Sequence, residues 1–304
     1  MQKIYTSGKI LVMLLITSSL INFYGCRSCN KRSANQEAGL DVDTTVLDDI
    51  SQAKKIFYSL PSPLETAMLI KTAGATYNEK LLNPLSNVSG YTTNRSMALN
   101  LGIYTTDLSF ASLFDQTQTS INYMQAAKKM ADGLGILDAI DNNTIQKLEE
   151  NVNNRDVIMD IISETFMASS SFLKENDRTA VASIVLVGGW LEGLYIATQL
   201  VDPSNIKNNK LVERIIDQKL SFDIVLKLLN ENKENPDVAS LIVEMNELKQ
   251  IFNKIEIKTS KIQAVPDNKT NVTTLKSVSK VTVTTETFQE LTEKVKTIRA
   301  NFIL

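Results

Sequence analysis

Apolar residues recur at helical spacing along most of this chain. From Asp43 to Leu60 they are separated by four and three positions in turn, which places them on one face of an α-helix: Val46, Ile50, Ala53, Phe57 and Leu60. Similar patterns predict a helical hairpin over 93–133 and helices over 155–175, 207–231, 236–257 and 285–302. The pattern therefore predicts an all-α protein, built as an irregular multi-helix bundle.

Capping residues mark several of the predicted helix ends. Ser62 is placed as an N-cap, Pro63 occupies the first helical position, and Glu65 completes a capping box with Ser62. Gly74 is a plausible C-cap for the same helix. Two later starts carry related signals, namely Asn235 before Pro236, and the pair Thr287 and Glu290.

The stretch VASIVLVGGWLEGLYIATQL, residues 181–200, is the most apolar part of the chain after the N-terminal region. Its glycines do not have the spacing of a phosphate-binding loop. Its length would also suit a membrane span, but Glu192 near its middle and the flanking amphipathic helices favour a buried core helix. Glycine and alanine would let this helix approach its neighbours closely.

Residues 259–284 differ in composition, being rich in Thr, Val, Ser and Lys. Their alternation fits either a short hairpin or an extended connector before the C-terminal helix. The predicted organisation is thus a signal peptide over 1–25, a flexible tether over 26–42, a helical domain over 43–258, and a Thr/Val-rich connector plus final helix over 259–304.

The N-terminal region has the pattern of an export signal. Lys3 and Lys9 precede an apolar run from Ile10 to Phe23, and about fourteen helical residues reach roughly 21 Å, less than the ~30 Å hydrocarbon core. A small residue, Gly25, then precedes Cys26. An ordinary secretory signal or an uncleaved anchor are the alternatives.

The residues Phe23, Tyr24, Gly25 and Cys26 resemble the processing site of a bacterial lipoprotein signal, although the first two depart from the usual Leu and small residue. The resemblance implies that Cys26 is acylated and anchors the chain to a membrane of the cell envelope, facing the periplasm or the surface. Cys29 would then be a lone thiol in the tether.

The composition excludes several kinds of catalytic and metal-binding site but does not identify an activity. The chain has no histidine, which removes Ser-His-Asp and Cys-His nucleophile activation as well as histidine-bearing metal sites. A net charge of -2 gives no electrostatic case for nucleic acid. No cofactor and no metal site is predicted.

Glu192 is a candidate functional residue because it lies beside Trp190 on the most apolar helix. A buried carboxylate there is either ion-paired or has a raised pKa that would suit a general acid. The commoner of these is a structural ion pair, and the candidate partners are Arg95, Arg155 and Arg178.

Asp107 has the same ambiguity, and Tyr104, three residues earlier, would share its helix face. Asp107, Glu192, Tyr104 and Trp190 together form the candidate ligand-binding set. Asp160 and Glu164 could offer two oxygens to a cation, but such a pair is more often a solvated face.

The stretches SPLETAMLIKTAGATYN, LNLGIYTTDLSFASL and GGWLEGLYIATQL resemble a group of uncharacterised helical lipoproteins from Gram-negative bacterial envelopes. The resemblance implies a location and no activity.

The first functional hypothesis is a non-enzymatic, lipid-anchored domain that binds an envelope protein. The alternative is a periplasmic small-molecule-binding protein with a pocket inside the bundle, and an enzyme using the carboxylates ranks last. A deep pocket holding Asp107 and Glu192 would favour a ligand or a reaction, whereas a closed, ion-paired core would favour a protein partner.

Overall fold

The computed structural model describes residues 62–137, 146–148, 150–151, 154–259, 263–267, 272–276 and 279–304. The chain divides into two compact units, Met1–Asp48 and Asp49–Leu304, and every described residue belongs to the second. The predicted signal peptide, the predicted acylation site at Cys26, the predicted tether and the predicted helix over 43–60 all lie outside the described residues.

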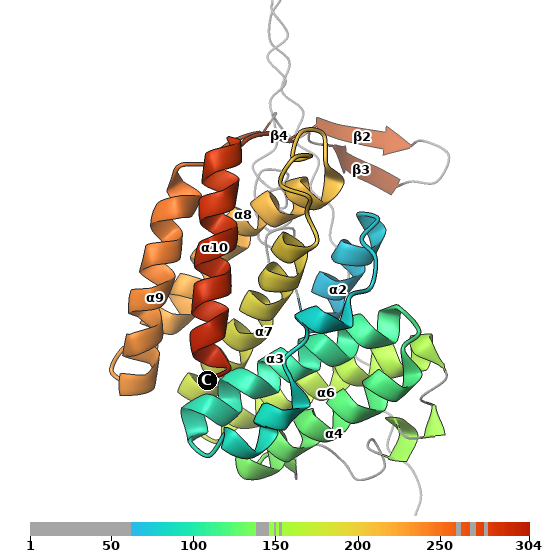
Figure 1. Ribbon diagram of the computed structural model, residues 1–304, viewed down its shortest axis with the longest axis vertical. Helices are drawn as coiled ribbons and strands as arrows, with labels where there is room; N and C mark the ends of the chain where they lie inside the picture. Colours follow the sequence, from blue (N-terminus) through green and yellow to red (C-terminus); the bar gives the residue numbers. More distant parts are fainter. Residues whose placement is uncertain are drawn as a thin grey trace, which may run out of the picture. The chain divides into compact units, whose positions relative to one another are not determined.

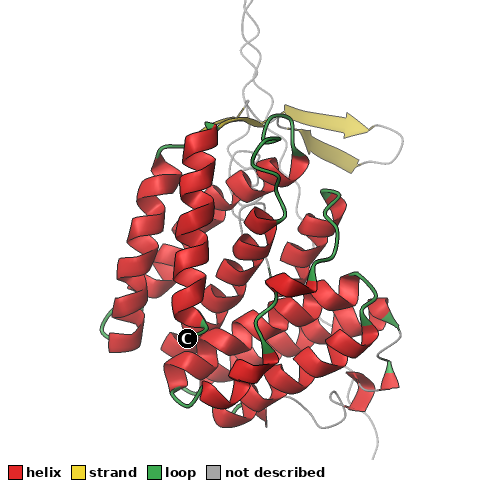
Figure 2. Cartoon of the chain, in the orientation of Figure 1, coloured by secondary structure: helices red, strands yellow, loops and turns green. Residues whose placement is uncertain are grey.

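The described part is an all-α multi-helix bundle, which confirms the predicted fold class (Figures 1 and 2). Its α-helices are α2 (Pro63–Thr72), α3 (Asn94–Leu113), α4 (Thr117–Gly133), α6 (Arg155–Glu175), α7 (Thr179–Gln199), α8 (Lys210–Asn230), α9 (Pro236–Asn253) and α10 (Thr285–Phe302). Two short 3-10 helices, η1 (Glu79–Leu81) and η2 (Leu85–Gly90), occupy the segment between α2 and α3.

Helices α3 and α7 cross at the centre of the bundle, and glycines make the crossing possible. A Cβ atom on Gly102 of α3 would overlap the backbone carbonyl of Val185, and one on Gly188 of α7 would overlap the carbonyl of Leu99. With both Cβ atoms missing, the two backbones come into direct contact. This explains the glycines of the apolar stretch as a packing device.

The remaining helices surround this crossing. Helices α8 and α10 pack on α7, and α9 packs on α8 and α10. Helices α4 and α6 pack on α3, and α2 contacts both α3 and α7. Figure 1 shows α7, α9 and α10 running alongside one another, with α3 and α4 passing across the lower ends of α7 and α10.

Helix α7 is the one helix of the described residues that is long and apolar enough to cross a membrane by length and composition. In the bundle, 78% of its most apolar 18-residue window is buried against protein. The burial agrees with the prediction of a core helix.

The predicted start of α2 is confirmed in detail. The backbone N–H of Glu65 donates to Ser62 Oγ at 3.2 Å, and the N–H of Ser62 donates to Glu65 Oε2 at 2.7 Å. Gly74 follows the C-cap, Ala73, with φ of 90°, a left-handed conformation that glycine adopts without strain.

Other boundaries differ from the sequence prediction. The N-cap of α10 is Thr284, whose Oγ1 accepts from the N–H of Thr287, so the predicted capping box of Thr287 with Glu290 is wrong. Helix α8 begins after Asn209 rather than at Lys207, because the Asn209 side chain caps it.

Residues 256–282 contain nested antiparallel strands, so the hairpin is the alternative that the structure adopts. Strand β1 (Glu256–Thr259) pairs with β4 (Ser279–Thr282), and β2 (Gln263–Asp267) pairs with β3 (Val272–Lys276). Helix α9 ends at Asn253, and Ile257, the predicted helix end, lies in β1.

Candidate functional site

Glu192 forms a buried ion pair with Arg299 of α10. The guanidinium binds the carboxylate through two parallel bonds, Nε to Oε2 at 3.0 Å and Nη2 to Oε1 at 3.0 Å. The Glu192 side chain is 0% exposed and that of Arg299 is 8% exposed. Arg299 makes two further contacts, because Nη2 also donates to the Leu81 carbonyl at 3.2 Å and the guanidinium lies over the Tyr195 ring.

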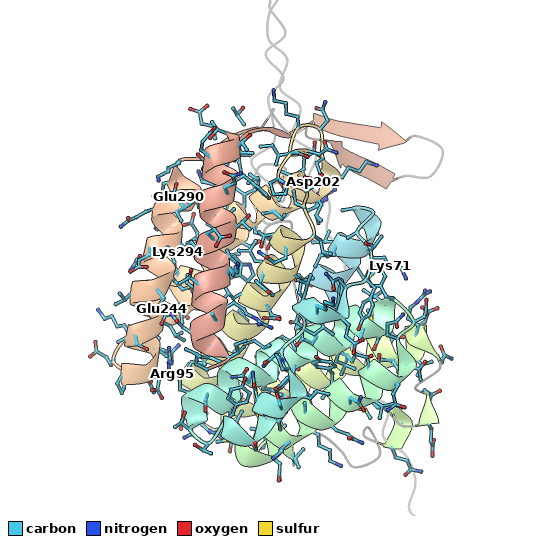
Figure 3. The ribbon with its side chains drawn as sticks, viewed as in Figure 1. Lys71, Arg95, Asp202, Glu244, Glu290 and Lys294 are labelled. Carbon is cyan, nitrogen blue, oxygen red and sulfur yellow. The ribbon has the colours of Figure 1, made fainter. Side chains whose placement is uncertain are left out.

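The predicted ion pair of Glu192 is therefore present, but its predicted partners are wrong. The three candidate arginines have partners elsewhere: Arg95 with Glu244 at 3.6 Å, Arg155 with Asp156 at 3.2 Å, and Arg178 with the Leu134 carbonyl at 2.7 Å. Figure 3 shows Arg95 near Glu244, away from the centre of the bundle. Arg299 lies 107 positions from Glu192, so no local pattern could have selected it.

Asp107 lies against this pair and is itself fully buried. Its Oδ2 accepts a hydrogen bond from the backbone N–H of Asn83 at 3.0 Å, whereas Oδ1 has no donor among the described residues. Burial and the adjacent Glu192 carboxylate raise the pKa of Asp107 well above its usual range, although Arg299 and the Asn83 N–H oppose this.

A protonated Asp107 fits these surroundings. The acid proton lets Asp107 donate a hydrogen bond to the Glu192 carboxylate, and it leaves one negative charge opposite the single positive charge of Arg299. Burial by itself would lower the pKa of Arg299, but the Glu192 carboxylate raises it above its ordinary value. With a proton on Asp107, the three residues Asp107, Glu192 and Arg299, named here the carboxyl–arginine triad, carry no net charge.

Further buried polar residues, which sequence reasoning missed, extend from the triad to the C-terminal end of α10. The Asn100 amide donates to the Phe302 carbonyl at 2.9 Å, and the Tyr91 hydroxyl donates to the Ile303 carbonyl at 3.1 Å. Asn83 links them, because its Nδ2 donates to Asn100 Oδ1 at 2.9 Å. An asparagine in a loop and another inside a helix carry no local signal of such pairing.

Tyr104 lies beside Asp107 as predicted from its spacing, but it is surrounded by other rings. It packs against Tyr91 and Tyr123, with centroid distances of 6.2 and 5.9 Å, and its hydroxyl donates to the Pro84 carbonyl at 3.2 Å. Burial raises the pKa of Tyr104 and of Tyr123.

Trp190 is not part of this cluster. Its Nε1–H donates to Gln218 Oε1 at 3.1 Å, and its ring stacks on Phe222. Asp160 and Glu164 are exposed on α6, and no group of three or more acidic or cysteine side chains with metal-ligand spacing occurs in the described part of the chain.

A cavity of about 220 Å³ lies elsewhere in the bundle, between α3, α4, α6 and α7. None of the four candidate residues lines it. The described residues that do are Leu101, Thr105, Leu108, Met124, Gln125, Ala127, Lys128, Ala131, Leu137, Leu148, Ile162, Thr165, Phe166, Ser169, Ser170, Leu173, Ala182, Val185 and Leu186.

The wall of this cavity is mostly aliphatic, and small residues create its space. Ala127 of α4, Ser169 of α6 and Ala182 of α7 stand where larger side chains would fill the gap between the helices. These small residues are evident in the sequence, but small residues on a helix face ordinarily indicate close packing between helices. Only the three-dimensional arrangement distinguishes a close contact from a cavity.

Comparisons of the chain with protein-family models, with curated proteins and with solved structures found no match. The functional argument therefore rests on the geometry of the triad and of the cavity.

Proposed function

We propose that this protein is a non-enzymatic binding protein of the cell envelope, anchored by lipid at Cys26, whose helical domain takes the apolar chain of a small molecule into the cavity between α3, α4, α6 and α7. The cavity is the observation that carries the proposal. The proposed ligand site differs from the one predicted from the sequence. The ligand lies in the cavity and not beside Asp107 and Glu192, because these two residues are enclosed with Arg299.

The size of the cavity supports a ligand of modest length. An engineered apolar cavity of about 150 Å³ holds benzene, a molecule of six carbons. In the same proportion, about 220 Å³ accommodates roughly nine carbons. An empty apolar space of this volume is a cost to stability, because its lining atoms lack contacts that a ligand would supply.

The test of binding is isothermal titration calorimetry of the full chain with 1-nonanol, a neutral molecule of matching size. The expected result is saturable binding at one site and a rise in the melting temperature, because a ligand that binds the native state stabilises it. An absence of saturable heat, with an unchanged melting temperature, would contradict the proposed function.

Variants that fill the cavity locate the site. Ala127→Leu and Ala182→Leu place new atoms in the cavity from two different helices, and each is expected to abolish nonanol binding while preserving the fold. Ala239→Leu, at an exposed position of α9, is the matched control and should bind as the wild type does. Equal binding by all four proteins would place nonanol outside the cavity.

The anchor has a separate test. Cys26→Ser is expected to abolish incorporation of radiolabelled palmitate in a bacterial host and to release the protein from the membrane fraction. Continued labelling of that variant would contradict acylation at Cys26, and Cys29→Ser serves as the matched control.

A protein partner is the second candidate function, and the closed carboxyl–arginine triad favours it over a ligand bound at those carboxylates. In-cell crosslinking of the anchored protein, followed by mass spectrometry, tests it. One discrete envelope protein recovered from the wild type and also from Ala182→Leu would support a partner independent of the cavity.

A further inference from the structure

We infer that the cavity ligand is an anionic amphiphile with a single short chain, held with its tail toward α7 and its acidic head at Lys128 on α4. This inference rests on the proposed function and adds the chemical class of the ligand. It is argued from the charge at the cavity, from one buried hydroxyl, and from the distribution of polar side chains along the wall.

The sign of the charge comes from the residues around the opening. Among the described residues that line the cavity, Lys128 is the one that carries a charge, and no lining carboxylate opposes it. Its side chain is exposed, and it forms no ion pair with a described residue. A carboxylate, phosphate or sulfate at the cavity mouth would therefore find a cation and meet no like charge.

The charge at the cavity lies on α4 and the side that α7 contributes is apolar, which suits an amphiphile, while α3 and α6 add the hydroxyl side chains of Thr105, Thr165, Ser169 and Ser170. Gln125 and Lys128 are both exposed on α4, three positions apart and thus on one face of that helix. The residues contributed by α7 are Ala182, Val185 and Leu186, all apolar. A ligand that lies with its head at α4 and its tail toward α7 matches both ends.

Thr165 supplies the independent observation. Thr165 lines the cavity wall. Its Oγ1 atom is buried and has no hydrogen-bond partner among the described residues. A buried hydroxyl without a partner costs free energy. An acidic head group has acceptor oxygens that this hydroxyl would satisfy, whereas a hydrocarbon has none.

The experiment compares nonanoate with 1-nonanol, which have the same chain and differ in charge. Lys128→Gln is expected to raise the Kd for nonanoate about fivefold, the size of an exposed ion pair, and to leave the Kd for nonanol unchanged. Lys129→Gln, one residue along and not part of the lining, is the matched control and should leave both unchanged. In 0.5 M salt the wild-type Kd for nonanoate should approach that of Lys128→Gln, because salt screens an exposed pair.

The possible outcomes separate the two proposals. Binding of both compounds with no effect of Lys128→Gln on nonanoate would overturn the anionic head and leave the cavity function intact. An equal loss on Lys129→Gln would overturn it too, since the effect would then be nonspecific charge. Failure of both compounds to bind would overturn the proposed function and this inference with it.

Discussion

Asp107 and Glu192 bring two acidic groups to a place where Arg299 supplies one positive charge. Three ionised groups there would leave a net negative charge in surroundings that water does not reach, which is costly. A proton on Asp107, in keeping with its raised pKa, would remove that charge. The triad therefore contributes to the stability of the fold, and the effect of a substitution on stability depends on which of the three residues is replaced.

Arg299→Met is expected to lower the free energy of unfolding by about 3–5 kcal/mol, because Glu192 is left buried without its partner. Urea unfolding followed by circular dichroism measures this. The control is Lys254→Met, which breaks a 2.7 Å pair with Glu290 whose side chains are half-exposed, and which should cost less than about 1 kcal/mol. Equal losses in the two variants would contradict the burial argument.

Asp107→Asn is expected to be tolerated and to become relatively more stable as pH rises. In the wild type the pKa of Asp107 is raised on folding, so its contribution is complete below the unfolded value of 3.8 and is lost as pH increases through the folded value. Asparagine keeps a donor and cannot ionise, so it does not lose this contribution. Urea unfolding between pH 4 and pH 9 gives the difference between the two proteins.

Asp107→Leu is the control for that experiment, because it matches the size of the side chain but accepts no bond from the Asn83 N–H. We expect it to cost about 1–3 kcal/mol across the pH range. If the difference between Asp107→Asn and the wild type does not change with pH, Asp107 is not protonated in the folded protein.

The residues of the triad were only partly accessible to sequence reasoning. Asp107 and Glu192 stand out as acidic groups in apolar helices, so a buried pair could be predicted from the sequence alone. Arg299 does not stand out, because it follows Lys294 and Lys296 on an amphipathic helix and its sequence context is that of an ordinary solvent-exposed cation. Its selection depends on how α10 packs on α7, which is a tertiary fact.

At the element scale, the close crossing of α3 and α7 depends on the absence of a Cβ atom at Gly102 and at Gly188. Gly102 and Gly188 face the opposite helix backbone, and a carbonyl group cannot move aside as the end of a flexible side chain can. The distance between these two helices is thereby fixed by backbone contact. The positions of α2, α8 and α10, which pack on α7, follow from it.

Gly102→Ala is expected to lower the free energy of unfolding by about 1–3 kcal/mol through overpacking against the Val185 carbonyl, even though alanine favours a helix intrinsically. Gly90→Ala is the matched control, since a Cβ at Gly90 meets nothing within 4 Å. Thermal unfolding compares the two. A loss at Gly90 as large as that at Gly102 would show that the effect is not one of close approach.

Helix existence was predicted well and helix ends less well. Ser62, Pro63 and Glu65 give three agreeing signals, and the start of α2 lies where they place it. At α10 the run of threonines offers several caps of equal quality, and Thr284 rather than Thr287 takes the role. Local chemistry cannot rank equivalent caps, and in the structure it is Thr284 that has the extended backbone of an N-cap, with φ of −85° and ψ of 160°.

At the scale of the whole molecule, the bundle has one continuous apolar core to which α2, α3, α4, α6, α7, α8, α9 and α10 all contribute. Such a core predicts a single unfolding transition for the described helices. The all-α class followed from the sequence because helical periodicity is local. The cavity could not be predicted from the sequence, because its volume depends on how side chains from four separate helices fill the space between them.

Trp190 allows cooperativity to be measured directly, since it is the single tryptophan of the chain and is 3% exposed on α7. We expect its fluorescence and the far-ultraviolet circular dichroism to report the same urea midpoint. Two separated midpoints would show that α7 and its neighbours unfold apart from the other helices. The comparison should use the full chain at one protein concentration.

The pairing of the C-terminal end of α10 with partners 107 and 202 positions earlier has a consequence for synthesis on the ribosome. A nascent chain that has reached residue 290 already contains all of α3 and α7, yet Glu192 has no counter-charge, and Asn100 has not met the carbonyl of Phe302. Early collapse around the α3–α7 crossing would enclose these groups unpaired, at a cost in free energy. Release of residues 299–303 from the ribosome is therefore required before the buried polar groups at the centre of the bundle can all be paired.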